Sequence, residues 1–204
     1  MKKSKDENTE EQILAAAKSV FQAKGMDGAR MQEIADKAGI NKAMLHYYFR
    51  SKQLLFEAVF KNVFLLLAPQ LNAILNDDSS IEEKIKNFTS NYISFISQHP
   101  YLPNFIIQEL NRNPEFILKF KNNKGFPDIT KFKKKVAEEV QQGVIKPIRA
   151  EQLFINILAL NIFPFVAQPL IMAFTDLDNQ AYQKLMEDRK TEAANFIINA
   201  IKNT

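Results

Sequence analysis

The sequence predicts an all-α fold, in which a small N-terminal domain of three helices is followed by a larger helical domain. Three observations support this prediction. Apolar residues recur at the spacing of a helix face along most of the chain, and capping residues or prolines bound these stretches. The 204 residues include only five glycines, which are too few for a sheet protein rich in tight turns. No stretch shows a convincing strand pattern.

The N-terminal domain is expected to occupy residues 1–52 and to contain three helices. Thr9-Glu-Glu-Gln12 reads as a capping box that opens the first helix, and Gly25 should end that helix with a left-handed backbone conformation. The second helix is expected over Met31–Ala38. The third is expected over Lys42–Phe49, because Asn41 is a good N-cap.

The larger domain is expected over residues 68–204, and a fourth helix from Lys52 to Leu67 should connect it to the first domain. This connecting helix should stop before Pro69, because proline disrupts a helix interior. Ser80 and Glu83 form a second capping box. The remaining helices are expected at residues 81–98, 102–111, 114–121, 126–142, 150–174 and 180–202.

Composition excludes several kinds of chemistry. The chain has no cysteine, which rules out disulfides, thiolate metal sites and cysteine nucleophiles. Its two histidines have no metal-ligand spacing, and there is no phosphate-binding glycine loop or nucleophile elbow. The charged first twelve residues do not form a signal peptide. We therefore expect a cytoplasmic protein that is not an enzyme and has no metal or cofactor.

Residues 30–50 contain the spacing of a helix-turn-helix. Ala35 is small where two helices would cross, and Gly39 permits the left-handed backbone of a tight turn. Leu45 would fill the small core beneath the turn, together with Ile34 and Ile40. The second helix of such a motif projects from the surface and fits a DNA major groove about 12 Å wide.

A helical hairpin inside a bundle would satisfy the same spacing, so the flanking residues matter. The unburied face of the second helix would carry His46 and Tyr47 beside Lys42, and Lys52 follows at the next helix N-terminus. A helix N-terminus favours an anion such as phosphate. Aromatic and cationic groups together in this place favour DNA binding over a solvated surface.

Residues 13–59 resemble the DNA-binding domain of the TetR/AcrR family of bacterial regulators. The resemblance rests on I-L-x-A-A at 13–17, F-x-x-x-G at 21–25, E-I-A-x-x-A-G-I at 33–40 and L-H-Y-Y-F-R-S-K at 45–52. It implies a homodimeric, cytoplasmic transcription regulator, most simply a repressor, with a helical domain that binds an effector. Neither the effector nor the operator follows from the resemblance.

The resemblance also implies roles for individual residues. The second helix of the motif, expected over Lys42–Phe49, is the recognition helix that would enter the major groove. Base contacts are expected from its first turn, and phosphate contacts from the positions that follow this turn. The DNA-binding residues expected are Arg30, Gln32, Lys42, Ala43, Met44, His46, Tyr47, Tyr48 and Lys52. Arg30 stands in place of the usual threonine N-cap, Met44 in place of threonine or serine, and His46 in place of tyrosine. Met44 would thus contact a thymine methyl group.

Residues 153–174 contain no charged side chain and are long enough to span a membrane. Their asparagines, glutamine and two prolines favour a buried helix instead, so no membrane association is expected. A helix that is apolar on nearly all sides must bury more than one face. Dimerisation through the helices near 150–174 and 180–202, as the family implies, would cover the second face.

The effector site is predicted only from aromatic content, since the chain has seventeen phenylalanines and no tryptophan. A small apolar or amphipathic effector would fit a cavity lined by Phe88, Tyr92, Phe95, Phe105, Glu109, Phe116 and Phe163. Each of these residues could equally belong to an ordinary core. An alternative function is a helical interaction module whose C-terminal domain binds a protein partner.

Overall fold

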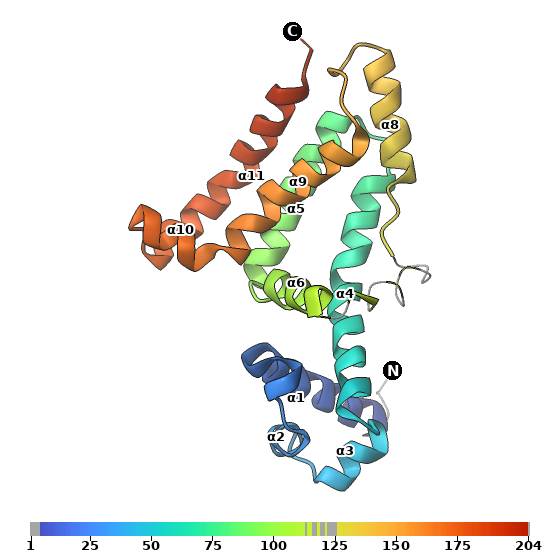
Figure 1. Cartoon of the computed structure of the whole chain (residues 1–204), viewed down its shortest axis with the longest axis vertical. Coiled ribbons are helices and arrows are strands. Elements are labelled where there is room, and N and C mark those ends of the chain that lie inside the picture. Colours follow the sequence, from blue (N-terminus) through green and yellow to red (C-terminus); the bar gives the residue numbers. More distant parts are fainter. Residues whose placement is uncertain (1–4, 113, 116–117, 119–120, 122–125, 204) are drawn as a thin grey trace. The chain divides into compact units, whose positions relative to one another are not determined.

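The computed structural model describes residues 5–112, 114, 115, 118, 121 and 126–203. The chain divides into two units, Met1–Leu66 and Leu67–Thr204. Within the described residues all regular structure is helical, except for one isolated antiparallel bridge between Ile145 and Lys202 (Figure 1). The predicted all-α class is confirmed.

The first unit contains α1 (Lys5–Gly28), α2 (Met31–Lys37), α3 (Lys42–Tyr48) and the beginning of α4 (Lys52–Asn76). Gly25 interrupts the helical geometry of α1 with a φ of 67°, as its position in the sequence predicted. The predictions for α2 and α3 are each confirmed to within one residue.

The capping box expected at Thr9 is wrong, because α1 begins at Lys5 and Thr9 lies inside the helix. Asp6 falls in the first turn of the longer helix, where its negative charge stabilises the positive end of the helix dipole. Thr9 instead forms a side-chain hydrogen bond with Tyr48. The side chain of Thr9 therefore bonds Tyr48 of α3 and does not cap its own helix.

The core of the first unit brings α1, α2, α3 and α4 together. The rings of Phe21 and Phe56 meet edge to face with centroids 5.0 Å apart. The other buried apolar side chains come from all four helices and include Ile13, Ala17, Val20, Ile34, Ala35, Leu45, Leu55, Val59 and Phe60. This core leaves little freedom to the short helices α2 and α3, which are too short to be stable alone.

Helix α4 is longer than predicted, because it continues past Pro69 to Asn76. A proline inside a helix costs about 3 kcal/mol. Ala68, Ile74 and Leu75 are buried on the added turns. Burying an aliphatic side chain such as isoleucine or leucine contributes about 1.5–3 kcal/mol, so their packing offsets that cost.

The second unit contains the rest of the helices. Ser80 and Glu83 form the predicted capping box at the start of α5. Figure 1 shows α5, α9 and α11 running side by side, and these three helices pack against one another. The helix expected near 114–121 lies largely outside the described residues. The helices are α5 (Ile81–Gln98), α6 (Leu102–Arg112), α8 (Thr130–Gln141), α9 (Ala150–Val166), α10 (Gln168–Thr175) and α11 (Asn179–Ile201).

The single long helix expected over 150–174 is wrong, because the chain bends by 75° between α9 and α10. Pro169 lacks the N–H that would continue the helix, and its ring would clash with the carbonyl of Phe165. Ala167 lies at the break, where its N–H closes α9 on the carbonyl of Phe163 at 2.8 Å. Its own carbonyl opens α10 by accepting the N–H of Ile171 at 2.9 Å.

Side chains of α11 bind two carbonyl groups that the prolines and the bend leave without helical partners. Pro164 cannot donate to the carbonyl of Leu160, and Arg189 Nη2 donates to that oxygen at 2.7 Å. The hydroxyl of Tyr182 donates to the carbonyl of Pro164 at 2.6 Å. These bonds remove the cost of burying unpaired carbonyls and hold the bend against α11.

No single helix in the described residues has the length and hydropathy to cross a membrane. Only the bent pair α9 and α10 meets those criteria when the two helices are taken together.

Candidate nucleic-acid interface

The turn between α2 and α3 is fixed by backbone hydrogen bonds. Gly39 has a φ of 68°, and its N–H donates to the carbonyl of Asp36 at 3.1 Å. The N–H of Ile40 donates to the carbonyl of Ala35 at 3.0 Å. Together these bonds form a Schellman motif, which ends α2 and requires a left-handed residue. The direction of α3 is thus set within six residues of sequence.

Helix α3 is fixed at both ends and on its inner face. The Oδ1 atom of Asn41 accepts the backbone N–H of Met44 at 2.7 Å and caps the helix. Leu45 is fully buried, and its carbonyl accepts the N–H of Phe49 at 2.8 Å. With one wholly buried residue and an N-cap, α3 has a single orientation on the core of its unit.

The outer face of α3 carries the residues expected to contact bases. Met44 is 39% exposed and Tyr47 is 82% exposed, so both side chains can contact a partner. Lys42, Ala43 and His46 are exposed as well. The structure therefore brings together, on one free helix face, five of the nine residues predicted to bind DNA.

Tyr48 lies at the last turn of α3 and contacts α1. Its hydroxyl donates to Oδ1 of Asp6 at 3.1 Å and also bonds Thr9. Partial loss of water and the carboxylate of Asp6 raise the pKa of Tyr48. Its ring meets that of Tyr47 edge to face. The sequence pattern did not indicate this contact, since Asp6 and Tyr48 are 42 positions apart.

The other predicted DNA contacts lie around α3. Lys52 is half-buried, and its ammonium group donates to the carbonyls of Asp27 at 3.2 Å and Ala29 at 3.1 Å. Arg30 is exposed at the N-cap position of α2 and makes no capping bond. Gln32 is exposed, and its amide donates to Asp36 at 2.8 Å. Lys52 thus joins two segments of its own unit, whereas Arg30 reaches solvent.

The predicted effector residues of α5 and α6 lie mainly in the core of the second unit. Phe88 and Tyr92 are buried and stacked, with ring centroids 5.4 Å apart. Phe105 and Glu109 are buried on α6, and Glu109 receives a hydrogen bond from Arg112 at 3.3 Å. The remaining three are scattered: Phe95 is half-buried, Phe163 is 56% exposed, and Phe116 lies outside the described residues.

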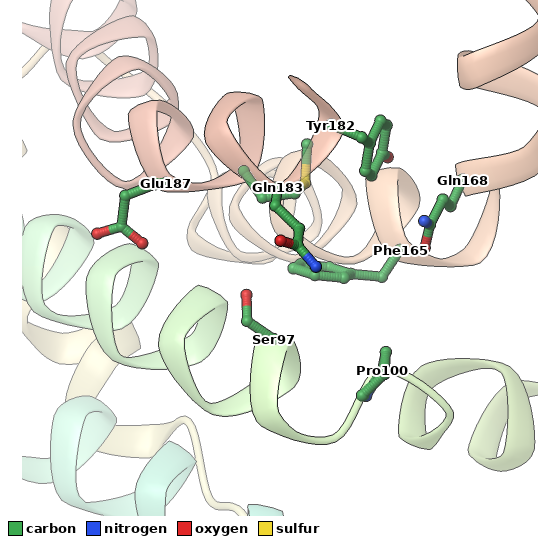
Figure 2. Close-up of a pocket in the computed structure, with 8 residues that line it drawn as sticks. Ser97, Pro100, Phe165, Gln168, Tyr182, Gln183 and Glu187 are labelled. Atoms are coloured by element: carbon green, nitrogen blue, oxygen red, sulfur yellow. The ribbon is translucent and has the colours of Figure 1, made fainter. Parts of the chain in front are cut away.

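A cavity of about 360 Å³ lies elsewhere in the second unit, between the end of α5, the α9–α10 bend and the start of α11 (Figure 2). Its lining includes Phe165, Gln168, Gln183 and Glu187. None of the residues predicted for the effector site is among those that line it. The prediction was centred on α5 and α6, and it therefore missed Gln183 and Glu187 of α11.

Comparison with known proteins agrees with this arrangement. Residues 13–59 match the sequence model of the family "Bacterial regulatory proteins, tetR family". The chain is 38% identical over 65 residues to the transcriptional regulator RutR of Escherichia coli, covering 32% of this chain and 31% of RutR. It is 28% identical over 94 residues to the transcriptional repressor NicS of Pseudomonas putida, covering 46% and 44%. The matched part thus spans less than half of either relative.

The likeness of fold extends over the whole chain. The crystal structure of HlyIIR, a hemolysin II transcriptional regulator, superposes with a TM-score of 0.62 at 25% identity, covering 97% of this chain and 99% of HlyIIR. The family consists of regulators and not of enzymes, in agreement with the absence of a catalytic motif in the sequence. Residues 13–59, which hold the helix-turn-helix, are thus similar to the TetR family of bacterial regulatory proteins, and the fold of the whole chain is similar to that of the regulator HlyIIR.

Proposed function

We propose that this chain is a cytoplasmic transcriptional repressor that binds a palindromic DNA operator as a homodimer and is released by a small effector. The observation that carries this proposal is the free face of α3, where Lys42, Met44 and Tyr47 stand exposed on a helix fixed by Asn41 and Leu45. A rigid helix loses little conformational entropy when it enters a groove. Its side chains can then distinguish base pairs.

The exposed residues have complementary roles in this proposal. Lys42 would bind a guanine edge, and the apolar end of Met44 would contact a thymine methyl group. Tyr47, His46 and Arg30 would bind neighbouring phosphates or bases. The ammonium group of Lys52 has three protons and two carbonyl partners in its own unit, so a phosphate would be its third acceptor.

A homodimer accounts for the apolar surface of the second unit. Large apolar side chains are exposed on each of its last three helices, and such a surface favours association in water. A two-fold dimer presents two recognition helices to half-sites about 34–36 Å apart. The exposed side chains are Ile155 and Phe163 of α9, Leu170 and Phe174 of α10, and Leu185 and Phe196 of α11.

The repressor assignment draws on NicS, whose name describes a repressor. An effector would act by binding more tightly to a dimer whose recognition helices do not match the half-sites. If the chain were instead a helical interaction module, its second unit would bind a protein and its affinity for DNA would not depend on sequence.

Selection from a random DNA library, followed by gel shifts, tests the proposal. The full chain should select a two-fold symmetric site, and log K should fall with log salt by about 0.9 for each phosphate contact. Phe196→Glu should produce monomers in sedimentation experiments and weaken operator binding, whereas Gln180→Glu, an exposed change in the same helix, should do neither. Binding without a preferred sequence would contradict the proposal.

A further inference from the structure

The cavity between α5, the α9–α10 bend and α11 has the composition of a site for an organic amine. Helices α5, α9, α10 and α11 supply its walls, and its volume of about 360 Å³ falls within the range of small-molecule sites, about 300–1,000 Å³. Its inner surface is apolar, because Phe165, Tyr182 and Met186 line it and are each at least nine-tenths buried. An apolar or aromatic body would therefore be covered on one side.

The polar lining of the cavity consists of two amides and a hydroxyl, which can donate or accept, and one carboxylate, which only accepts. Figure 2 shows Gln183 and Glu187 of α11 pointing toward α5, from which Ser97 points back. Gln168 adds a second amide at the bend. Among the described residues that line the cavity there is one carboxylate and no lysine, arginine or histidine. This arrangement disfavours an anionic ligand such as a carboxylate or a phosphate. It favours a ligand that is positively charged and donates hydrogen bonds.

Two cationic residues, Arg189 and Lys190, follow Glu187 in the sequence, and neither of them lines the cavity. Arg189 donates to the carbonyl of Leu160 at 2.7 Å. Lys190 pairs with Glu187, with Nζ at 2.6 Å from Oε2 and 2.7 Å from Oε1. An exposed pair of this kind is worth about 0–1 kcal/mol, and a carboxylate has about four acceptor positions. Glu187 can thus accept a second cation from the cavity side.

The hydroxyl of Tyr182 is already bonded to the carbonyl of Pro164, so its ring rather than its oxygen faces the cavity. Aromatic rings attract cations through their negative faces. We propose that this cavity binds a small organic cation, a primary amine with an aromatic or aliphatic body, whose ammonium group lies between Glu187 and Ser97. The inference deepens the proposed function, because the amine would be the effector of the regulator.

Because the cavity lies at the α9–α10 bend, a bound ligand could change the position of α10. Phe165 and Gln168 flank Ala167, at which α9 ends and α10 begins. A ligand bound against both helices would favour one angle of this bend. The α10 residues Leu170 and Phe174, which are exposed, would move with that angle.

Isothermal titration calorimetry on the full chain without DNA tests the site separately from the regulatory function. The probes are 2-phenylethylammonium and 3-phenylpropionate, which have similar bodies and opposite charges. We expect the ammonium compound to bind at least tenfold more tightly than the carboxylate. Equal affinities, or tighter binding of the carboxylate, would overturn the proposal. A failure of DNA binding would leave this result unaffected.

Three variants localise the bound probe. Glu187→Gln should weaken 2-phenylethylammonium about fivefold, as expected for an exposed ion pair of about 1 kcal/mol. Glu192→Gln removes the same charge from an exposed position of α11 that does not line the cavity, and should leave the affinity unchanged. Ser97→Phe should fill the cavity and abolish binding. Retained binding in Ser97→Phe, or equal losses in the two glutamate variants, would refute this site.

Discussion

The turn at Gly39 and the bend at Ala167 both end one helix and start another, but they are stabilised in different ways. The first is closed by its own backbone, through the bonds of Gly39 and Ile40 to α2. The second depends on α11, whose Tyr182 and Arg189 bind carbonyls 18 and 29 positions away in the sequence. A local turn gives α3 a fixed direction, whereas the direction of α10 depends on packing against another helix.

Helix α3, which follows the turn, and helix α10, which follows the bend, also differ in how firmly they are packed. Leu45 of α3 is wholly buried and holds that helix on its core. All eight residues of α10 are described, and none of them is buried. Exposed side chains on α3 therefore suit a rigid partner such as DNA. The exposed apolar side chains of α10, Leu170 and Phe174, would be covered by a second protein surface. We therefore propose that α10 lies in the dimer interface.

The largest effect is expected from removing the anchor of α3. Leu45→Ala should lower the free energy of unfolding of the first unit by about 3 kcal/mol, because it leaves a cavity in a fully packed site. Leu170→Ala on α10, where the side chain is 53% exposed, should change the unfolding of a monomer by less than about 0.5 kcal/mol. Urea denaturation followed by circular dichroism measures both. Similar losses for the two variants would remove the contrast between these helices.

A smaller effect is expected at the bend. Tyr182→Phe leaves the carbonyl of Pro164 without its hydroxyl partner and should cost about 1–3 kcal/mol in the second unit. Its ring should still pack in place, so helix content should be unchanged. Unchanged stability in Tyr182→Phe would mean that α11 does not hold the bend.

The smallest effect is expected at the turn itself. Gly39→Ala should cost about 1–2 kcal/mol, because a φ of 68° is unfavourable for any residue with a Cβ. Nothing lies within 4 Å of the added atom, so the cost is conformational and not steric. Gly39→Asn should recover part of the loss, since asparagine tolerates this conformation. Thermal unfolding of the three proteins measures the series.

The same contrast explains what the sequence could predict. The bounds of α2, α3 and α5 followed from short-range signals such as Asn41, Gly39 and the Ser80–Glu83 box. The start of α1 and the continuation of α4 past Pro69 did not, because both depend on contacts with residues remote in sequence. The break at Ala167 has a local cause in Pro169, but the bonds from Tyr182 and Arg189 that hold it come from α11.

The candidate sites also divide into features that a local sequence pattern predicted and features that depend on contacts remote in sequence. The outer face of α3 was predicted residue by residue, because helical periodicity fixes which side chains stand opposite Leu45. The bond from Tyr48 to Asp6 was not, and neither was the cavity at Phe165 and Glu187. Both join helices that are far apart in the sequence. Aromatic content alone directed the search to α5 and α6.

If α3 distinguishes DNA sequences, replacing Met44 on its exposed face should reduce that discrimination. Fluorescence anisotropy should measure the affinity of the parent and of Met44→Ala for the selected operator and for a scrambled duplex at one salt concentration. The variant should lose about 1–3 kcal/mol of discrimination between the two duplexes while its affinity for scrambled DNA is unchanged. The same ratio of affinities in both proteins would contradict it.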